Sequence, residues 1–217
     1  MNIDIKNKNL VLIGQFNPLQ FDKYFFIKNE FFSEEEISDK SIFSEFQVHL
    51  FSKHFAMLIH LDRIQISDLS PDYDGENELP DFACKLLSLV NNSFPLIAIG
   101  INFQWFVHDG NKSIENLSKE VFYSKDISIF EKYFNTEDVA FGTYVSKKIK
   151  DARLKLEVKP IVAMNIKNKT GETLLNWLFN FHIDLPENCD QTQVNSYIKD
   201  FDYYKNESLQ IISTIKS

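Results

Sequence analysis

The sequence is short of the residues on which several familiar functional motifs depend. Its 217 residues include two cysteines, six glycines and two arginines. Two cysteines without a CxxC motif exclude a disulfide-rich scaffold and a four-thiolate zinc site. The glycines are too far apart for a GxGxxG or GxxxxGK[ST] phosphate-binding loop, and there is no GxSxG motif. The common nucleotide-binding and serine-hydrolase signatures are therefore missing.

Basic charge and long apolar runs are also scarce. Lys and Arg number 23 against 31 Asp and Glu, which gives a net charge of −8. This balance makes nucleic acid an unlikely partner, because such surfaces need a basic stripe, but it suits neutralising a basic protein. The longest apolar run, 94–101, is far too short to span a membrane, and the N-terminus has no signal-peptide core. We expect a cytoplasmic protein without a membrane segment.

Apolar residues are plentiful, and most of them follow strand-like patterns. They make up 44% of the chain and include 21 phenylalanines, which is enough for a sizeable core. Alternation over 97–107 is the strongest strand signal. Further strands are predicted at 10–16, 46–51, 55–61, 63–69, 139–145, 153–159, 161–166 and 172–185.

Helical spacing of apolar residues occurs in a few segments. It predicts helices over 81–90, with Asp81 as N-cap, and over about 192–214, capped by Asp190 or Thr192. Shorter helical patterns cover 21–32 and 127–134. The polar stretch that ends at Lys119 shows no such pattern.

The order of these elements predicts an α+β fold with antiparallel sheets, a few amphipathic helices and a long C-terminal helix. Runs of strands with single helices between them, and no βαβ rhythm, are typical of that class. Segments 1–110 and 120–217 each contain several strands, one helix and one long strand with a tryptophan, Trp105 or Trp177. Two loosely duplicated β-rich halves and a single compact domain both remain open as interpretations.

No metal or cofactor is predicted. His49, His54 and His60 are close in sequence, but on a hairpin turning at Lys53 we expect His60 on the opposite face from His49. The acidic loop 72–78 carries its glycine too early for a calcium-binding loop. Metal ligands must converge on one point, and neither set is expected to do so.

A polar stripe is the strongest candidate for a functional site. Opposite the apolar residues of the two tryptophan-bearing strands lie amides, an imidazole and a carboxylate. If those strands are neighbours, the polar residues share one sheet face beside the small residues Ala98 and Gly100. Such a face could bind a ligand or a partner chain, or it could be the plain solvated face that antiparallel sheets often have. The candidate residues are Asn102, Gln104, Asn176, Asn180, His182 and Asp184.

Several segments together resemble a sporadically distributed, uncharacterised prokaryotic protein family. They are Tyr73-Asp74-Gly75 leading to Pro80-Asp81-Phe82, then 99–103, then Phe181-His182-Ile183-Asp184 before a final helix, and the opening strand 11–18. The order of residues around Asn102 departs from the aromatic–asparagine pair that members often carry. The family brings no activity with it. Its patchy distribution implies cargo of mobile elements or defence islands.

Two hypotheses for function follow. The first is a non-catalytic intracellular binding protein, such as an accessory or immunity-type subunit of a prokaryotic defence or toxin–antitoxin module, with a protein partner or a second copy of itself. The missing catalytic signatures and the excess of phenylalanine favour it. The alternative is a hydrolase with a dispersed active site that uses His182, Asp184 and Asn180.

Overall fold

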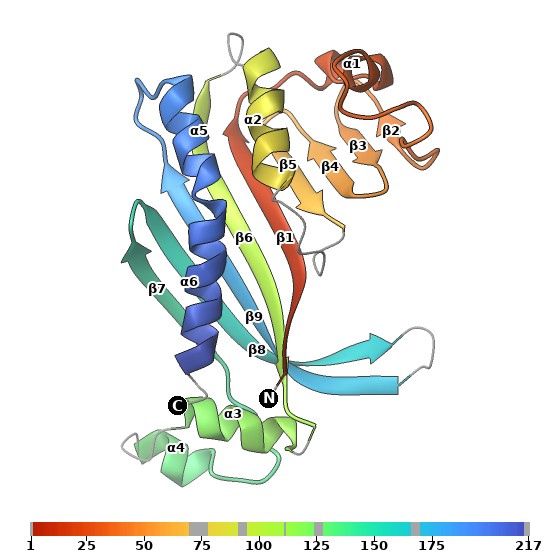
Figure 1. Cartoon of the computed structure of the whole chain (residues 1–217). Helices are drawn as coiled ribbons and strands as arrows, with labels where there is room; N and C mark the ends of the chain where they lie inside the picture. The colour runs from red at the N-terminus through yellow and green to blue at the C-terminus, as the bar shows by residue number, and fades with distance from the viewer. Residues whose placement is uncertain are drawn as a thin grey trace.

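The fold is built on one antiparallel sheet. The computed structural model describes residues 2–69, 78–90, 95–110, 112–123, 128–165 and 170–214. Within this part of the chain the strands form a nine-stranded sheet in the order β2-β3-β4-β5-β1-β6-β9-β8-β7 (Figure 1). The predicted α+β class is confirmed.

The strands and helices have the following bounds. The strands are β1 Asn2–Gly14, β2 Ile42–Phe43, β3 Val48–Phe51, β4 Phe55–Ile59, β5 Arg63–Asp68, β6 Leu96–His108, β7 Thr143–Ile149, β8 Ala152–Asn165 and β9 Thr170–Asp184. The helices are a 3-10 turn at Pro18–Gln20, α1 Lys23–Lys28, α2 Glu78–Val90, α3 Ile114–Phe122, α4 Ser128–Tyr133, α5 Gln191–Lys199 and α6 Phe201–Ser213.

The two predicted halves meet in the middle of the sheet. β1 pairs with β5 on one side and β6 on the other, and β6 pairs in turn with β9. The tryptophan-bearing strands are therefore neighbours, with Trp105 directly opposite Trp177. Strands from 1–110 and from 120–217 belong to one continuous sheet.

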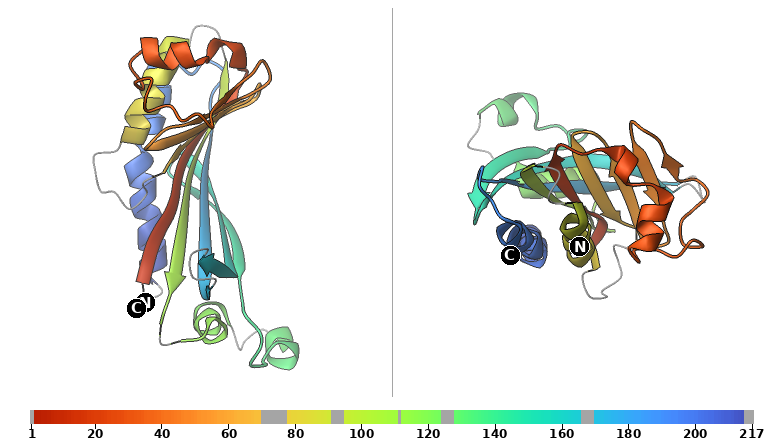
Figure 2. Two further views of the ribbon diagram at one scale, coloured as in Figure 1. Left: turned by 90° about the vertical axis from the view of Figure 1, so that its right-hand side faces the viewer. Right: turned by 90° about the horizontal axis from the view of Figure 1, so that it is seen from above.

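The helices α2, α5 and α6 cover one face of this sheet (Figure 2). Beneath them the strands present buried apolar side chains, and the rings of Phe103 and Phe201 lie 4.9 Å apart while those of Phe181 and Tyr204 lie 4.7 Å apart. The indole Nε1 of Trp105 donates a hydrogen bond of 2.9 Å to the hydroxyl of Ser208 on α6. This face holds the main core.

The predicted long C-terminal helix consists of two consecutive helices. Asp190 caps α5 through a capping box, in which its carboxylate accepts from the Gln193 backbone N–H and the Gln193 side chain accepts from the Asp190 N–H. The chain bends at Asp200, which ends α5 and precedes α6. The bend lets both helices follow the twisted sheet (Figure 1).

Some bounds are shifted, as for the strand predicted at 10–16, which is β1, and the one predicted at 139–145, which is β7. Three further element predictions were wrong in detail. α2 starts at Glu78, not after Asp81, because Pro80 is tolerated within the first turn of a helix. The segments 153–159 and 161–166 are parts of the single strand β8, which continues through Pro160. The pairing of β7 with β8 ends at Val158 of β8. At Pro160 one side of β8 therefore has no neighbour among the described strands. The N–H that proline lacks is not needed for a hydrogen bond there.

The third error concerns the stretch before residue 123, which contains the helix α3. Ser113 caps it by accepting a hydrogen bond from the Asn116 N–H, and Ile114 and Leu117 are buried. The ring of Phe122 on this helix packs against Trp177 at the end of the helix-covered face, with the ring centroids 6.0 Å apart. Only a few apolar residues are buried, so the sequence pattern is weak.

Candidate functional site

All six candidate residues lie on the sheet face opposite the helices. In the pairing of β6 with β9, Asn102 faces Asn180, Gly100 faces His182 and Ala98 faces Asp184. These positions alternate with the buried aromatic positions on both strands, so they point away from α6. The two tryptophan-bearing strands are neighbours, which is the condition under which these polar residues share one face.

Three asparagines on adjacent strands form a hydrogen-bonded row, which we call the amide ladder: Asn9, Asn102 and Asn180. The Asn102 side-chain amide donates to the Oδ1 of Asn9 at 2.8 Å, and the Asn180 amide donates to the Oδ1 of Asn102 at 2.5 Å. Asn9 pairs directly with Asn102 across β1 and β6. The ladder therefore crosses the adjacent strands β1, β6 and β9 at right angles to them.

Asn9 was missed by sequence reasoning. It belongs to an alternation in which Asn7 and Asn9 lie on one face of β1, while Leu10 and Leu12 lie on the other. That alternation is a visible signal in the sequence. Only the pairing of β1 with β6, which joins residues more than ninety positions apart, shows that Asn9 completes the ladder.

A second amide contact lies one step along the strands. The Gln104 amide donates to the Oδ1 of Asn176 at 3.0 Å, and Asn176 is buried with 8% of its surface exposed. Asn7 stands opposite Gln104, and its buried Oδ1 has no hydrogen-bond partner within the described part of the chain. The open face thus carries donors and acceptors that are only partly used within the sheet.

His182 and Asp184 extend the polar stripe along β9. The His182 Nε2 lies 3.1 Å from the Asp184 Oδ1. The Asp184 side chain is 88% exposed, whereas that of His182 is 29% exposed. A carboxylate so open to water orients an imidazole weakly, because solvent screens the pair.

Basic side chains on β8 border the polar stripe. Arg153 stands opposite His182, Lys155 opposite Asn180 and Lys159 opposite Asn176. The Arg153 Nη1 donates to the Ser146 hydroxyl at 3.0 Å, and the Lys159 Nζ pairs with the Glu157 carboxylate at 2.8 Å. One side of the site is thus more cationic than the net charge of the chain suggests.

Two small residues, Ala98 and Gly100, lie beside the ladder, and both are buried. The helices α2, α5 and α6 lie on the other side of the sheet (Figure 2). A Cβ atom added to Gly100 would lie 3.5 Å from the Cβ of Val11 and 3.8 Å from the Asn180 amide nitrogen, which is ordinary contact. The neighbouring side chains thus cover the backbone of Gly100.

The histidine prediction needs a correction. His49 and His60 share a face, with ring centroids 6.3 Å apart. The tight turn between β3 and β4 pairs His49 with Leu58, so residue 60 lies on the same face as residue 49. Even so, the described residues contain no group of three or more His, Cys, Asp or Glu side chains that could hold a metal ion. The acidic loop 72–77 lies outside the described residues.

Neither cysteine has the properties of an activated nucleophile. Burial raises the pKa of the Cys84 thiol on α2, and burial with the neighbouring Asp190 carboxylate raises that of Cys189. A reactive cysteine needs a lowered pKa, which a positive neighbour or a helix N-terminus provides. Both thiols are also remote in the fold from the amide ladder, since they lie on α2 and just before α5.

Comparisons with known proteins give no relative. No protein-family model, no curated protein and no solved structure matches this chain. Within the described residues, no helix combines the length and the apolar character that crossing a bilayer requires.

Proposed function

We propose that this chain is a non-catalytic, cytoplasmic binding protein whose open sheet face takes a protein partner, either a different protein or a second copy of the chain. The observation that carries the proposal is the amide ladder, Asn9, Asn102 and Asn180, on the sheet face opposite α2, α5 and α6. Amide side chains and the cations beside them offer many hydrogen bonds but no reactive group.

The choice of residue in the ladder supports binding over a plain solvated face. Asparagine is depleted in strands, whereas threonine and other β-branched residues stabilise them. A face selected only for stability would carry threonine at positions such as 102 and 180. Positions that break a local preference without a compensating gain in packing are expected at functional sites.

The chemistry of the face indicates the kind of partner segment. Asparagine side chains both donate and accept, as a peptide backbone does. Lys155 and Arg153 stand at the edge of the same rows and favour carboxylates. We therefore infer a polar, partly acidic segment that lies across β6, β9 and β8 with its carboxylates near the exposed Lys155 and Arg153.

A place in a prokaryotic defence or toxin–antitoxin module, as an accessory or immunity-type subunit, remains part of the proposal. It rests on the resemblance of segments such as 99–103 and Phe181–Asp184 to the sporadically distributed family. A binding face without an activated nucleophile is compatible with a subunit that acts by occupying its partner.

A hydrolase centred on His182 is the second candidate, and the contact of His182 with Asp184 favours it. A His–Asp pair activates a nucleophile only when it is well oriented, as in buried triads. Asp184 is almost fully exposed, so the pair is a weaker basis than the ladder. This candidate would be favoured if the wild-type protein hydrolyses a test ester and the His182→Ala variant does not.

Site-specific photocrosslinking in the native cell tests the binding proposal. A photoreactive residue replaces Lys155, beside the ladder, or, as a matched control, exposed Asp202 on α6. We expect one discrete crosslinked protein at position 155 and none at position 202. Combining position 155 with Asn102→Thr and Asn180→Thr should reduce the yield by roughly tenfold, given that polar contacts at interfaces contribute about 1 kcal/mol each.

The outcomes separate the two forms of partner. A crosslink to the chain itself, with a dimer mass in light scattering, identifies a second copy; a different protein identifies a heteromeric complex. Equal crosslinking at 155 and 202, or a yield that the threonine variants leave unchanged, would contradict a specific role of the ladder.

A further inference from the structure

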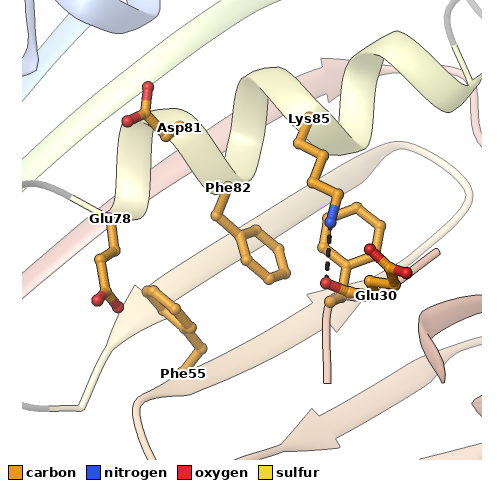
Figure 3. Close-up of a pocket in the computed structure, with 7 residues that line it drawn as sticks. Glu30, Phe55, Glu78, Asp81, Phe82 and Lys85 are labelled. Atoms are coloured by element: carbon orange, nitrogen blue, oxygen red, sulfur yellow. Dashed lines mark hydrogen bonds between the residues drawn. The ribbon is translucent and has the colours of Figure 1, made fainter. Parts of the chain in front are cut away.

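A cavity on the other side of the molecule has a composition suited to a ligand. It lies between α2, the segment after α1 and the start of β4, and its volume is about 330 Å³ (Figure 3). That is the lower end of the range of small-molecule sites. It belongs to the helix-covered side of the sheet, so it is separate from the amide ladder. Its lining residues are Glu30, Phe31, Phe55, Glu78, Asp81, Phe82 and Lys85.

Three aromatic rings form the floor of the cavity. The Phe82 ring lies 4.9 Å from that of Phe31 and 5.0 Å from that of Phe55. Phe55 and Phe82 are 7% and 9% exposed, so their packing fixes them in place. A rigid aromatic floor attracts apolar chains and, through the negative charge of the ring faces, cations.

Carboxylates stand at the rim. Glu78 lies at one end of the row of rings and Glu30 at the other, whereas the carboxylate of Asp81 is turned away from the rings (Figure 3). With Lys85 as the cation of the lining, the formal charge is −2. The cavity therefore combines an apolar middle with an excess of negative charge at its ends.

Lys85 already places an ammonium group in this setting. Its Nζ lies 4.6 Å from the centre of the Phe31 ring and donates to the backbone carbonyl of Glu30 at 2.8 Å. The side chain is thus an internal example of an alkylammonium ion held over an aromatic ring. It occupies the Phe31 end and leaves the rings of Phe55 and Phe82 to the rest of the cavity.

We propose that this cavity binds a linear aliphatic diamine. Its two ammonium groups match the opposed carboxylates of Glu30 and Glu78, and its methylene chain matches the Phe55 and Phe82 rings between them. A monoamine satisfies one end only. The excess of carboxylates over Lys85 disfavours a fatty acid or a phosphate ester.

Calorimetric titration of the full chain tests the proposal with cadaverine as the diamine and pentylamine as the matched monoamine. Cadaverine should bind at one site and at least fivefold more tightly than pentylamine. Glu30→Gln with Glu78→Gln should weaken cadaverine binding roughly tenfold, while Glu35→Gln, an acid outside the cavity, should not. Lys85→Met removes the competing ammonium and should strengthen binding several-fold.

A further variant separates the ligand site from folding. Glu30 has a φ of 55°, in the left-handed region that favours glycine. Glu30→Gly therefore removes the carboxylate while relieving the backbone, so the melting temperature should be unchanged or higher and cadaverine binding weaker. Equal affinity for cadaverine and pentylamine, no change in the glutamate variants, or binding of a lysine-rich peptide here without binding of cadaverine would overturn the proposal.

Discussion

The two faces of β6 and β9 differ sharply in polarity although one backbone carries both. On the helix side Trp105, Phe103 and Ile101 stand opposite Trp177, Phe179 and Phe181, and all are buried. On the other side the alternate positions carry mostly amides, a glycine and a histidine, with the half-buried Phe106 and Leu178 among them. Along this pair of strands, residues that stabilise the core alternate with residues of the proposed binding face. Substitutions one position apart should have effects of different kinds.

The largest expected contrast is between Phe181 and its neighbour His182. Phe181 is fully buried and its ring contacts those of Tyr204 and Phe179. Phe181→Ala should lower the free energy of unfolding by about 3–5 kcal/mol, through lost transfer energy and a cavity. His182→Ala, on the open face, should change it by less than about 0.5 kcal/mol. Urea denaturation measures both, and similar losses would contradict the division between faces.

The second contrast concerns a charge on the apolar side. Lys8 is 4% exposed and its Nζ lies 2.9 Å from the Asp68 carboxylate, which is 18% exposed. Lys8→Met removes the cation and should destabilise by about 2–3 kcal/mol, less than for a fully buried pair because Asp68 reaches some solvent. Lys8→Met with Asp68→Leu should recover most of this loss.

The same denaturation measurement decides this second prediction. A double variant as unstable as Lys8→Met would mean that Asp68 stabilises the fold through contacts other than Lys8. A stable single variant would mean that the pair contributes little, as exposed ion pairs do.

The division between faces could be predicted from the sequence where it depends on local alternation. The apolar positions from Ile99 to Val107 and the polar positions 176, 180, 182 and 184 follow a period of two, which Leu178 interrupts, so their opposite orientation was evident; Ile97, predicted on the apolar face, is exposed instead. The hydrogen-bonding partners were not, because strand order depends on contacts between distant segments. Asn9 reaches the ladder only through the β1–β6 pairing, and the sequence does not show which strands pair.

Other misses come from a turn and from contacts between distant segments. His49 and His60 share a face because the length of the β3–β4 turn pairs His49 with Leu58 rather than with a neighbour of Leu58. The ion pair of Lys8 with Asp68 joins positions sixty residues apart, so a lysine within an apolar strand gave no hint of its partner. The aromatic cavity likewise assembles from three separate segments.

Alkaline pH provides a third way to compare the faces. Burial, with the carboxylates of Asp200 and Asp151, raises the pKa of Tyr204 well above its ordinary value. The unfolded chain loses this proton near pH 10 while the folded protein keeps it. The free energy of unfolding should therefore fall as pH rises above about 10, by about 1 kcal/mol at pH 11.

Tyr204→Phe tests the origin of this loss. Melting curves between pH 8 and pH 11 should be flatter for Tyr204→Phe than for wild type. Tyr24→Phe, on an exposed side chain, serves as the control and should follow wild type. An unchanged alkaline slope in Tyr204→Phe would show that other groups cause the loss.

The smallest expected effect on stability is the most informative about the open face. Asn102 is the middle of the ladder, donating to Asn9 and accepting from Asn180. Asn102→Thr loses these contacts on a partly exposed surface but gains the strand preference of a β-branched residue. The two terms are of similar size and opposite sign, so the free energy of unfolding should change by less than about 0.5 kcal/mol.

A near-neutral result in urea denaturation means that the ladder is not needed for the fold. Crosslinking at position 155 would then fall without any loss of folded protein, which assigns the asparagines to recognition. A loss of 2 kcal/mol or more, beyond the roughly 1 kcal/mol of an ordinary hydrogen bond, would instead show that the ladder holds the central strands together. Both faces of β6 and β9 would then stabilise the fold. The difference in free energy of unfolding between Phe181→Ala and His182→Ala should be correspondingly smaller.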